Sequence, residues 1–185
     1  MKHFTMEELT RSQTARTKGI DNTPSAEHRS NIEMTVAQLL DPLRGAWAVR
    51  CATQVWGTPA IRVSSGYRSP ALNKAVGGSD TSAHSVGFAF DMVPVNGRLA
   101  EFKAFCREFL TGRPFDQMIS EDEDAAGTPR WIHLGYKNRQ GGQRRQLRQM
   151  FAAPLDEGRC AADAVGNVAP EPDGHAFELL ERHVR

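Results

Sequence analysis

Two histidines and one aspartate stand where they could bind one metal ion together. His84 and Asp91 lie in a segment rich in glycine and small residues, Ser82–Asp91, and His133 follows in Trp131-Ile-His133. A catalytic zinc takes three protein ligands and keeps a fourth position open for water or substrate. Imidazole and carboxylate are ligand types that suit this cation. The three residues are therefore candidate ligands of a single zinc ion.

The sequence around two of these residues predicts how they are held. Residues 87–95 alternate as in a β-strand, which places Asp91 on the face opposite Phe88 and Phe90. The carboxylate therefore points away from one apolar layer. His84 comes just before this strand, in a glycine-containing loop whose backbone can bend to aim the imidazole.

The third candidate lies in a second strand pattern over residues 131–136, where His133 shares a face with Trp131. An imidazole from this strand can meet a carboxylate from a neighbouring strand. Taken singly, His84 would more often cap a turn, Asp91 would be a surface acid, and His133 would be a half-buried histidine with ordinary partners. The spacing of all three, with small residues around them, favours the metal site.

Helix and strand patterns alternate along the chain. A capping box over Thr5–Glu8 begins a short helix. A longer helix is expected from Thr23-Pro24, and its apolar face reaches Trp47 although Pro42 should kink or split it. Further helices are predicted after Ser69-Pro70 and over 99–109, and strands over 60–64, 87–95, 115–120 and 131–136. This order predicts an α+β domain with a small, mainly antiparallel sheet flanked by helices.

The composition is that of an ordinary globular protein. The 185 residues are 39% apolar and 24% charged with a net charge of +1, so no dominant attraction to nucleic acid or membrane is expected. No apolar run approaches the about 20 residues of a membrane span. Three cysteines are too few and scattered for a disulfide framework, and Cys51 and Cys106 are expected to be buried free thiols.

A basic stretch follows the last predicted strand. Its cations are most simply the solvated face of a helix, although attraction to anionic wall polymers is an alternative. No aromatic residues interleave with these charges, so nucleic-acid binding is not expected. The stretch consists of Lys137, Arg139, Arg144, Arg145 and Arg148.

Three motifs carry a family resemblance: Ser65-Gly-Tyr-Arg68-Ser, Ser82-x-His84-x-x-Gly87-x-Ala89-x-Asp91 and Trp131-x-His133. With them, the chain resembles the zinc D-alanyl-D-alanine carboxypeptidases, which cleave peptidoglycan, and within them the phage and prophage branch that includes endolysins. The resemblance runs from about Phe4 to Tyr136. It implies the fold of the hedgehog and D-Ala-D-Ala metallopeptidases, and one zinc per chain on His84, Asp91 and His133.

The resemblance also implies roles for residues around the metal. Arg68 becomes the cation that faces the substrate or its developing oxyanion, and Ser82 becomes a second substrate contact. Many members of the wider family carry a catalytic glutamate three positions before the last histidine, where this chain has Arg130. In the phage branch the glutamate instead belongs to a pattern similar to Gln-(Leu/Met)-Ile-x-Glu, which is followed by a loop and Trp-x-His. The glutamate of that pattern corresponds to Glu121 in this chain.

Hydrolysis needs such an acid as a general base. Glu121 continues the strand face of Ile119, whereas the next acids are expected progressively further into a loop. Asp122, Glu123 and Asp124 remain alternatives for the base. A purely solvated acidic loop is the other interpretation of this run.

The function that the resemblance implies is zinc-dependent hydrolysis of a peptide bond in the peptidoglycan stem peptide, as a carboxypeptidase or an endopeptidase, in cell-wall lysis or remodelling. A monomer without nucleic-acid or membrane partners is expected. The alternative, prompted by Arg130, is a catalytically inactive zinc-binding domain that acts as a cell-wall binding or virion structural module.

Two domains of unequal character are expected. Residues 1–151 form the zinc peptidase domain, and 152–185 hold seven acids against three arginines with Pro, Gly and Ala throughout, which predicts an acidic, loosely packed extension. The start of the chain lacks the apolar region of a secretory signal. Synthesis in the cytoplasm is therefore expected, with action on the wall only after release, as for a phage lysin.

Overall fold

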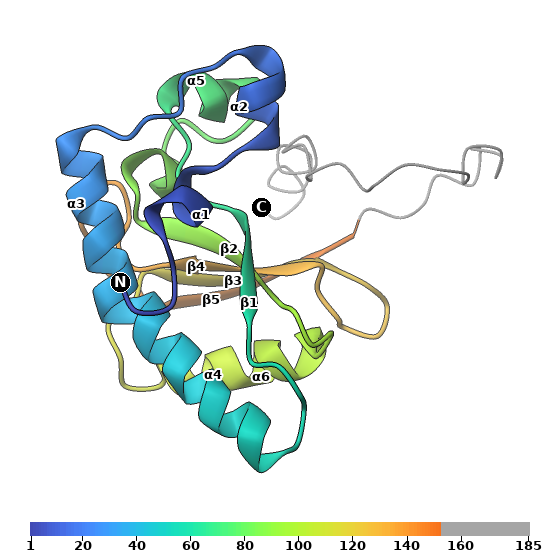
Figure 1. The fold of residues 1–185 in the computed structure, drawn as a ribbon. Coiled ribbons are helices and arrows are strands. Elements are labelled where there is room, and N and C mark those ends of the chain that lie inside the picture. Colours follow the sequence, from blue (N-terminus) through green and yellow to red (C-terminus); the bar gives the residue numbers. More distant parts are fainter. Residues whose placement is uncertain (153–185) are drawn as a thin grey trace, which may run out of the picture.

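The structure is a computed structural model, and it describes residues 1–152 (Figure 1). Its centre is a five-stranded sheet in the order β1-β2-β4-β3-β5. Neighbouring strands are antiparallel, except that β5 runs parallel to β3. The extension predicted over 152–185 lies, after its first residue, outside the described residues. The strands are β1 (Ile61–Ser65), β2 (Ala89–Pro94), β3 (Gln117–Glu123), β4 (Trp131–Gly135) and β5 (Gln146–Phe151).

Helices lie on both sides of this sheet. In Figure 1, α4 and α6 lie on one side and α2 and α5 on the other. The predicted α+β class, with a mainly antiparallel sheet flanked by helices, is confirmed. The helices are α1 (Met6–Thr10), α2 (Gln13–Lys18), α3 (Ala26–Thr35), the π-helix η1 (Val36–Leu40), α4 (Asp41–Thr53), α5 (Pro70–Ala75), the 3₁₀ turn η2 (Ala83–Val86) and α6 (Leu99–Leu110).

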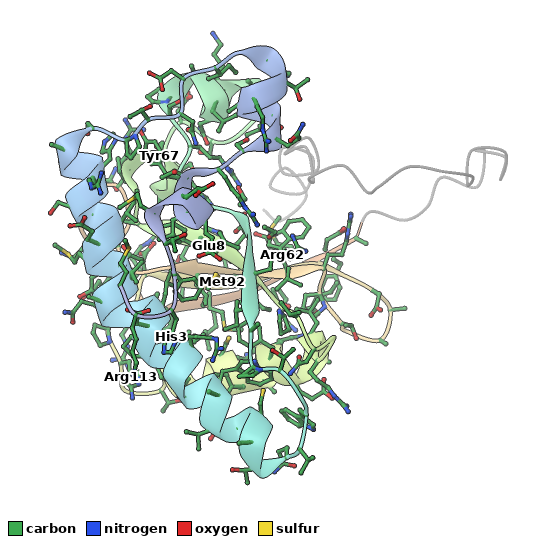
Figure 2. The ribbon with its side chains drawn as sticks, viewed as in Figure 1. His3, Glu8, Arg62, Tyr67, Met92 and Arg113 are labelled. Atoms are coloured by element: carbon green, nitrogen blue, oxygen red, sulfur yellow. The ribbon has the colours of Figure 1, made fainter. Side chains whose placement is uncertain are left out.

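The core fills the space between the sheet and the long helical run. Met92, labelled in Figure 2, projects from β2 and is fully buried with Trp47 of α4 and Phe102 of α6. The rings of Trp47 and Phe102 meet edge to face, with centroids 5.1 Å apart. Because one face of β2 is held by this core, its other face is left for polar side chains.

The long helix is continuous, but its hydrogen bonding changes just before Pro42. Over η1 the pattern widens, and the Asp41 N–H donates to the carbonyl of Val36, five residues back. The wider turn accommodates the proline ring, which would clash with the carbonyl four residues back in a regular helix. The helix begins at Ala26 with Ser25 as its N-cap, so the predicted start at Thr23-Pro24 was too early by two residues.

The segment over 137–151 corrects the prediction of a solvated basic helix. It forms a loop and then β5, because the Arg144 guanidinium binds Asp116 in a bidentate pair with both distances 2.7 Å. The backbone N–H of Gln146 then donates to the Asp116 carbonyl, and strand pairing with β3 follows. No local pattern signalled this strand, because β5 has no apolar alternation of its own.

Strand β3 also runs further than the predicted end at Ser120. It continues to Glu123 through a bulge at Asp122, whose φ is 54°. Because of this bulge, the side chains of the consecutive acids Glu121, Asp122 and Glu123 point in different directions. The capping box at Thr5 and Glu8 is confirmed, and so are the buried free thiols of Cys51 and Cys106.

The strand register builds one row of side chains across the face of the sheet opposite the core. Ser65 pairs with Asp91, Asp91 with His133, His133 with Ile119, and Ile119 with Arg148. Paired residues in neighbouring strands project to the same side. Within the described residues, no helix is long and apolar enough to cross a membrane.

Candidate metal centre and active site

The three predicted ligands come together on this face. His84 reaches over from η2, and Asp91 and His133 are register partners on β2 and β4. His84 Nε2 and His133 Nδ1 lie 3.2 Å apart, and Asp91 Oδ1 lies 3.4 Å from the first and 3.0 Å from the second. All three residues are buried.

These three separations fit a tetrahedral zinc site. Metal–ligand distances of about 2.0–2.1 Å at tetrahedral angles place neighbouring ligand atoms about 3.3 Å apart. The observed triangle of 3.0, 3.2 and 3.4 Å has that size. Two imidazole nitrogens and a carboxylate oxygen are also a donor set that zinc takes. The residues present therefore fit a zinc ion with one open position.

The backbone fixes the orientation of His84. Its Nδ1–H donates to the carbonyl of Gly66 at 2.8 Å, which leaves Nε2 as the atom with a free lone pair. Gly66 is glycine for a steric reason, since a Cβ there would collide with the carbonyl of Leu9. Gly87 ends the turn at a φ of 82°, the left-handed conformation that glycine adopts readily. The small residues of the sequence motif are thus explained by close backbone contacts.

The electrostatics keep His84 and Asp91 in the protonation states that a metal needs. Burial, with the charge of Arg68, lowers the pKa of His84 to about 4, so its imidazole is neutral at pH 7. Burial alone would raise the pKa of Asp91, but the charge and hydrogen bonds of His84 and His133 outweigh it and hold that pKa below its ordinary value. A neutral imidazole and an ionised carboxylate are the binding forms.

Glu121 lies one step along the same face. It pairs with Trp131 in the register, two residues beyond the pair of Ile119 and His133, and it is only 3% exposed. Its Oε1 is buried and has no hydrogen-bond partner among the described residues. Burial raises the pKa of Glu121 to about 7, against the opposing effect of His133. A buried carboxylate with a free oxygen and such a pKa is suited to take up and release a proton.

The other acids of this run have partners elsewhere. Asp122 pairs with Arg130 at 2.9 Å, and Glu123, also buried, pairs with Lys103 at 2.6 Å. Asp124 accepts backbone N–H bonds within the loop that follows. The expectation that these acids recede into a loop was wrong for Asp122 and Glu123, which both remain in β3, and Glu123 points away to α6. Among the four, only Glu121 lines the cleft that contains the metal cluster.

Arg68 and Ser82 also line this cleft, whose volume is about 1060 Å³. Arg68 Nη2 donates to Asp91 Oδ2 at 3.1 Å, and Nε and Nη2 donate to the Ser65 hydroxyl. Nη1 has no partner among residues 1–152, so its N–H groups can reach a ligand. The exposed Arg130 is held by Asp122 and does not line the cleft.

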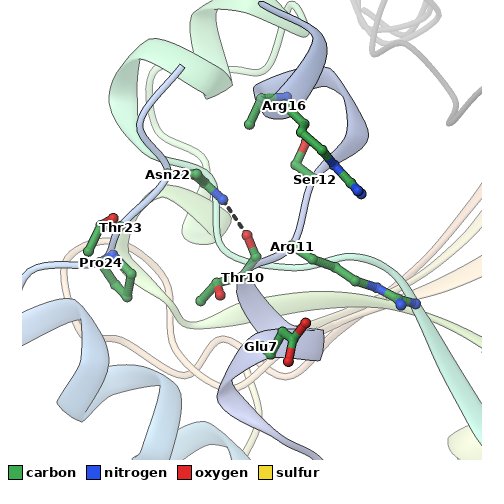
Figure 3. A pocket seen from close by; sticks show the side chains of 9 residues that line it. Glu7, Thr10, Arg11, Ser12, Arg16, Asn22, Thr23 and Pro24 are labelled. Atoms are coloured by element: carbon green, nitrogen blue, oxygen red, sulfur yellow. Dashed lines mark hydrogen bonds between the residues drawn. The ribbon is translucent and has the colours of Figure 1, made fainter. Parts of the chain in front are cut away.

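A smaller hollow, of about 600 Å³, lies beside α1 and α2 (Figure 3). Asn22 crosses it and donates from Nδ2 to the carbonyls of Thr10 and Tyr67, at 2.7 and 2.9 Å. Its Oδ1 accepts from the Ser69 N–H at 2.6 Å. These bonds hold the segment that carries Arg68, so this hollow supports the site rather than forming a second one.

A family model described as Peptidase M15 matches residues 2–134, which include every one of the site residues above. The chain belongs to the peptidase M15 family. These are the zinc D-Ala-D-Ala carboxypeptidases, so the resemblance seen in the sequence is confirmed at the level of the family. No curated protein matches the chain in a sequence comparison. As an M15 peptidase, the chain is a metallopeptidase by family, with a His/Asp/His cluster placed for a metal.

Sequence reasoning missed several parts of the cleft. The match ends at Leu134, and β5 lies beyond it, yet Arg148 and Met150 line the cleft. The carbonyl of Gly66 as the partner of His84 was missed as well. The glycine inside Ser65-Gly-Tyr-Arg68-Ser was the available signal for that contact, whereas β5 offered none.

Proposed function

We propose that this protein is a zinc-dependent hydrolase of a peptide bond in the peptidoglycan stem peptide. The observation that carries the proposal is the joint presence, in one cleft, of a ligand triangle of tetrahedral size and a buried glutamate with a free oxygen. His84, Asp91 and His133 are the proposed zinc ligands. A bound zinc would polarise the scissile carbonyl and make water a nucleophile at neutral pH.

The chain's own residues then divide the remaining work. Glu121 takes a proton from the attacking water at Oε1 and later delivers it to the leaving amine. Arg68 offers its Nη1–H groups to the carbonyl oxygen, where negative charge develops, or to a neighbouring carboxylate. Ser82, at the rim of the cleft, adds a hydroxyl to substrate binding. The buried surroundings strengthen each of these interactions.

The proposal extends to the bond that is cut, the place of action and the division of the chain. Cleavage removes a terminal D-alanine or cuts within the stem. The protein acts as a monomer on the cell wall after release, in the manner of a phage endolysin. Residues 1–151 form the peptidase domain and 152–185 form an acidic extension. Membership of the peptidase M15 family supports the peptidase activity in this proposal.

Mass spectrometry of purified peptidoglycan incubated with the zinc-loaded protein tests the function and identifies the bond. New stem-peptide products that disappear with a chelator are expected. Intact peptidoglycan under both conditions, with zinc bound, would favour the alternative of an inactive wall-binding or virion structural module. The exposed, paired state of Arg130 gives no support to that alternative, because the position it occupies does not face the cleft.

A further inference from the structure

The cleft contains cations that the proposed chemistry does not use. Its charged lining consists of four arginines, two carboxylates and the two histidines of the metal cluster. Arg68 is paired with Asp91, and Arg144 with Asp116. The other two arginines, Arg11 and Arg148, have no ion pair within residues 1–152.

Arg148 is the one of the two whose place relative to the metal cluster is defined by the register. It stands at one end of the cross-sheet row that passes through Ile119 and His133 to Asp91. Ser65, which binds Arg68, stands at the other end. Arg68 and Arg148 therefore flank the cluster on opposite sides.

The sheet geometry gives the separation. Neighbouring strands lie about 4.8 Å apart, so the backbone of Arg148, two strands from His133, is about 10 Å from it. An extended peptide advances about 3.3 Å per residue. A carboxylate that meets Arg148 therefore belongs to a residue about three positions from the bond at the metal cluster.

We propose that Arg148 is a specificity residue, which binds a substrate carboxylate about three residues to the N-terminal side of the scissile bond. The direction follows from Arg68, whose free N–H groups serve the scissile carbonyl or the carboxylate beyond it. This inference rests on the proposed function and deepens it. In a stem peptide cut between its last two residues, the third residue back is a γ-linked glutamate, whose α-carboxylate is either free or amidated.

The test uses two synthetic stem pentapeptides that differ only there, one with a free α-carboxylate and one with an α-carboxamide. An exposed ion pair contributes modestly, so the zinc-loaded protein is expected to show a kcat/KM about three- to fivefold higher for the acid. Arg148→Gln should bring the two peptides to equal kcat/KM. Arg148→Lys should keep most of the preference. Arg107→Gln, an equal loss of charge on α6 at the other side of the sheet, should keep all of it.

The inference would be overturned if Arg148→Gln preferred the acid peptide as strongly as the parent does. It would also be overturned if the parent cleaved both peptides equally well. Either result would leave the proposed function standing. If neither peptide is cleaved, calorimetric measurement of their binding separates the claim about the Arg148 subsite from the claim that the protein is a hydrolase. Tighter binding of the acid that Arg148→Gln abolishes would then support the subsite while the hydrolase proposal fails. Equal binding would overturn both.

Discussion

The buried carboxylate of Glu121 is expected to lower the free energy of unfolding of this protein at neutral and higher pH. In the folded chain burial raises the pKa of this carboxyl to about 7, whereas its ordinary value is 4.5. Between these values the folded chain keeps a proton that the unfolded chain has lost. Stability therefore falls as the pH rises from 4.5 to 7, and the full penalty remains above pH 7.

The size of the penalty follows from the two values. At about 1.4 kcal/mol per pH unit, the difference corresponds to about 3 kcal/mol at pH 8. Glu121→Gln keeps the shape of the side chain and removes the buried charge. In chelator-treated protein at pH 8, the variant is expected to melt roughly 6–12 °C higher than the parent, given about 2–4 °C per kcal/mol for a chain of this size.

Glu123→Gln is the matched control, because it makes the same substitution two residues away on the same strand. Glu123 is paired with Lys103 at 2.6 Å, so its replacement leaves a partly buried ammonium without its anion. The melting temperature should fall, with a loss of about 2–4 kcal/mol. Differential scanning calorimetry of the three proteins at pH 5 and pH 8 decides the matter. A Glu121→Gln variant that melts at or below the parent at pH 8 would refute the account of this carboxylate.

Three further outcomes are expected. Glu121→Gln should lower peptide turnover roughly a hundredfold or more while zinc stays bound, and turnover that falls instead in Glu123→Gln would move the base to that residue. Burial would raise the pKa of Glu123, but the hydrogen bond and charge of Lys103 lower it overall. The stability that this pair contributes is therefore present above pH 4.5 and is lost as the pH falls further. In urea unfolding at a series of pH values, Glu123→Gln should show a smaller loss of stability below pH 4.5 than the parent. Truncation after Phe151 should leave a folded, zinc-binding protein, and insolubility or a much lower melting temperature would show that the remaining residues belong to the core.

Much of the candidate site could be anticipated because its signals are local. Alternation in β2 put Asp91 on the polar face, and the same rule put His133 on its face of β4. The glycine-containing loop before β2 was expected to bend and aim the His84 imidazole, and Gly87 ends that turn at a φ of 82°. Short-range spacing therefore identified residues that the fold brings together.

The rest depended on contacts between distant segments. The strand β5 exists because Asp116 holds Arg144 and because the edge of β3 offers backbone partners, neither of which the local pattern of β5 reveals. The direction of Glu123 depended on Lys103 from α6, twenty residues earlier in the chain. Local periodicity cannot predict such pairings. Glu121 could be distinguished from the other acids of β3 as the candidate base only once these pairings were known.

Zinc content measured by mass spectrometry on the purified protein tests the central claim most directly. About one zinc per chain is predicted for the parent and for His3→Ala, an exposed histidine outside the cleft. The double variant His84→Ala, His133→Ala is predicted to retain almost none, since it removes two of three ligands. Full retention of zinc by the double variant would contradict the assignment of the metal centre.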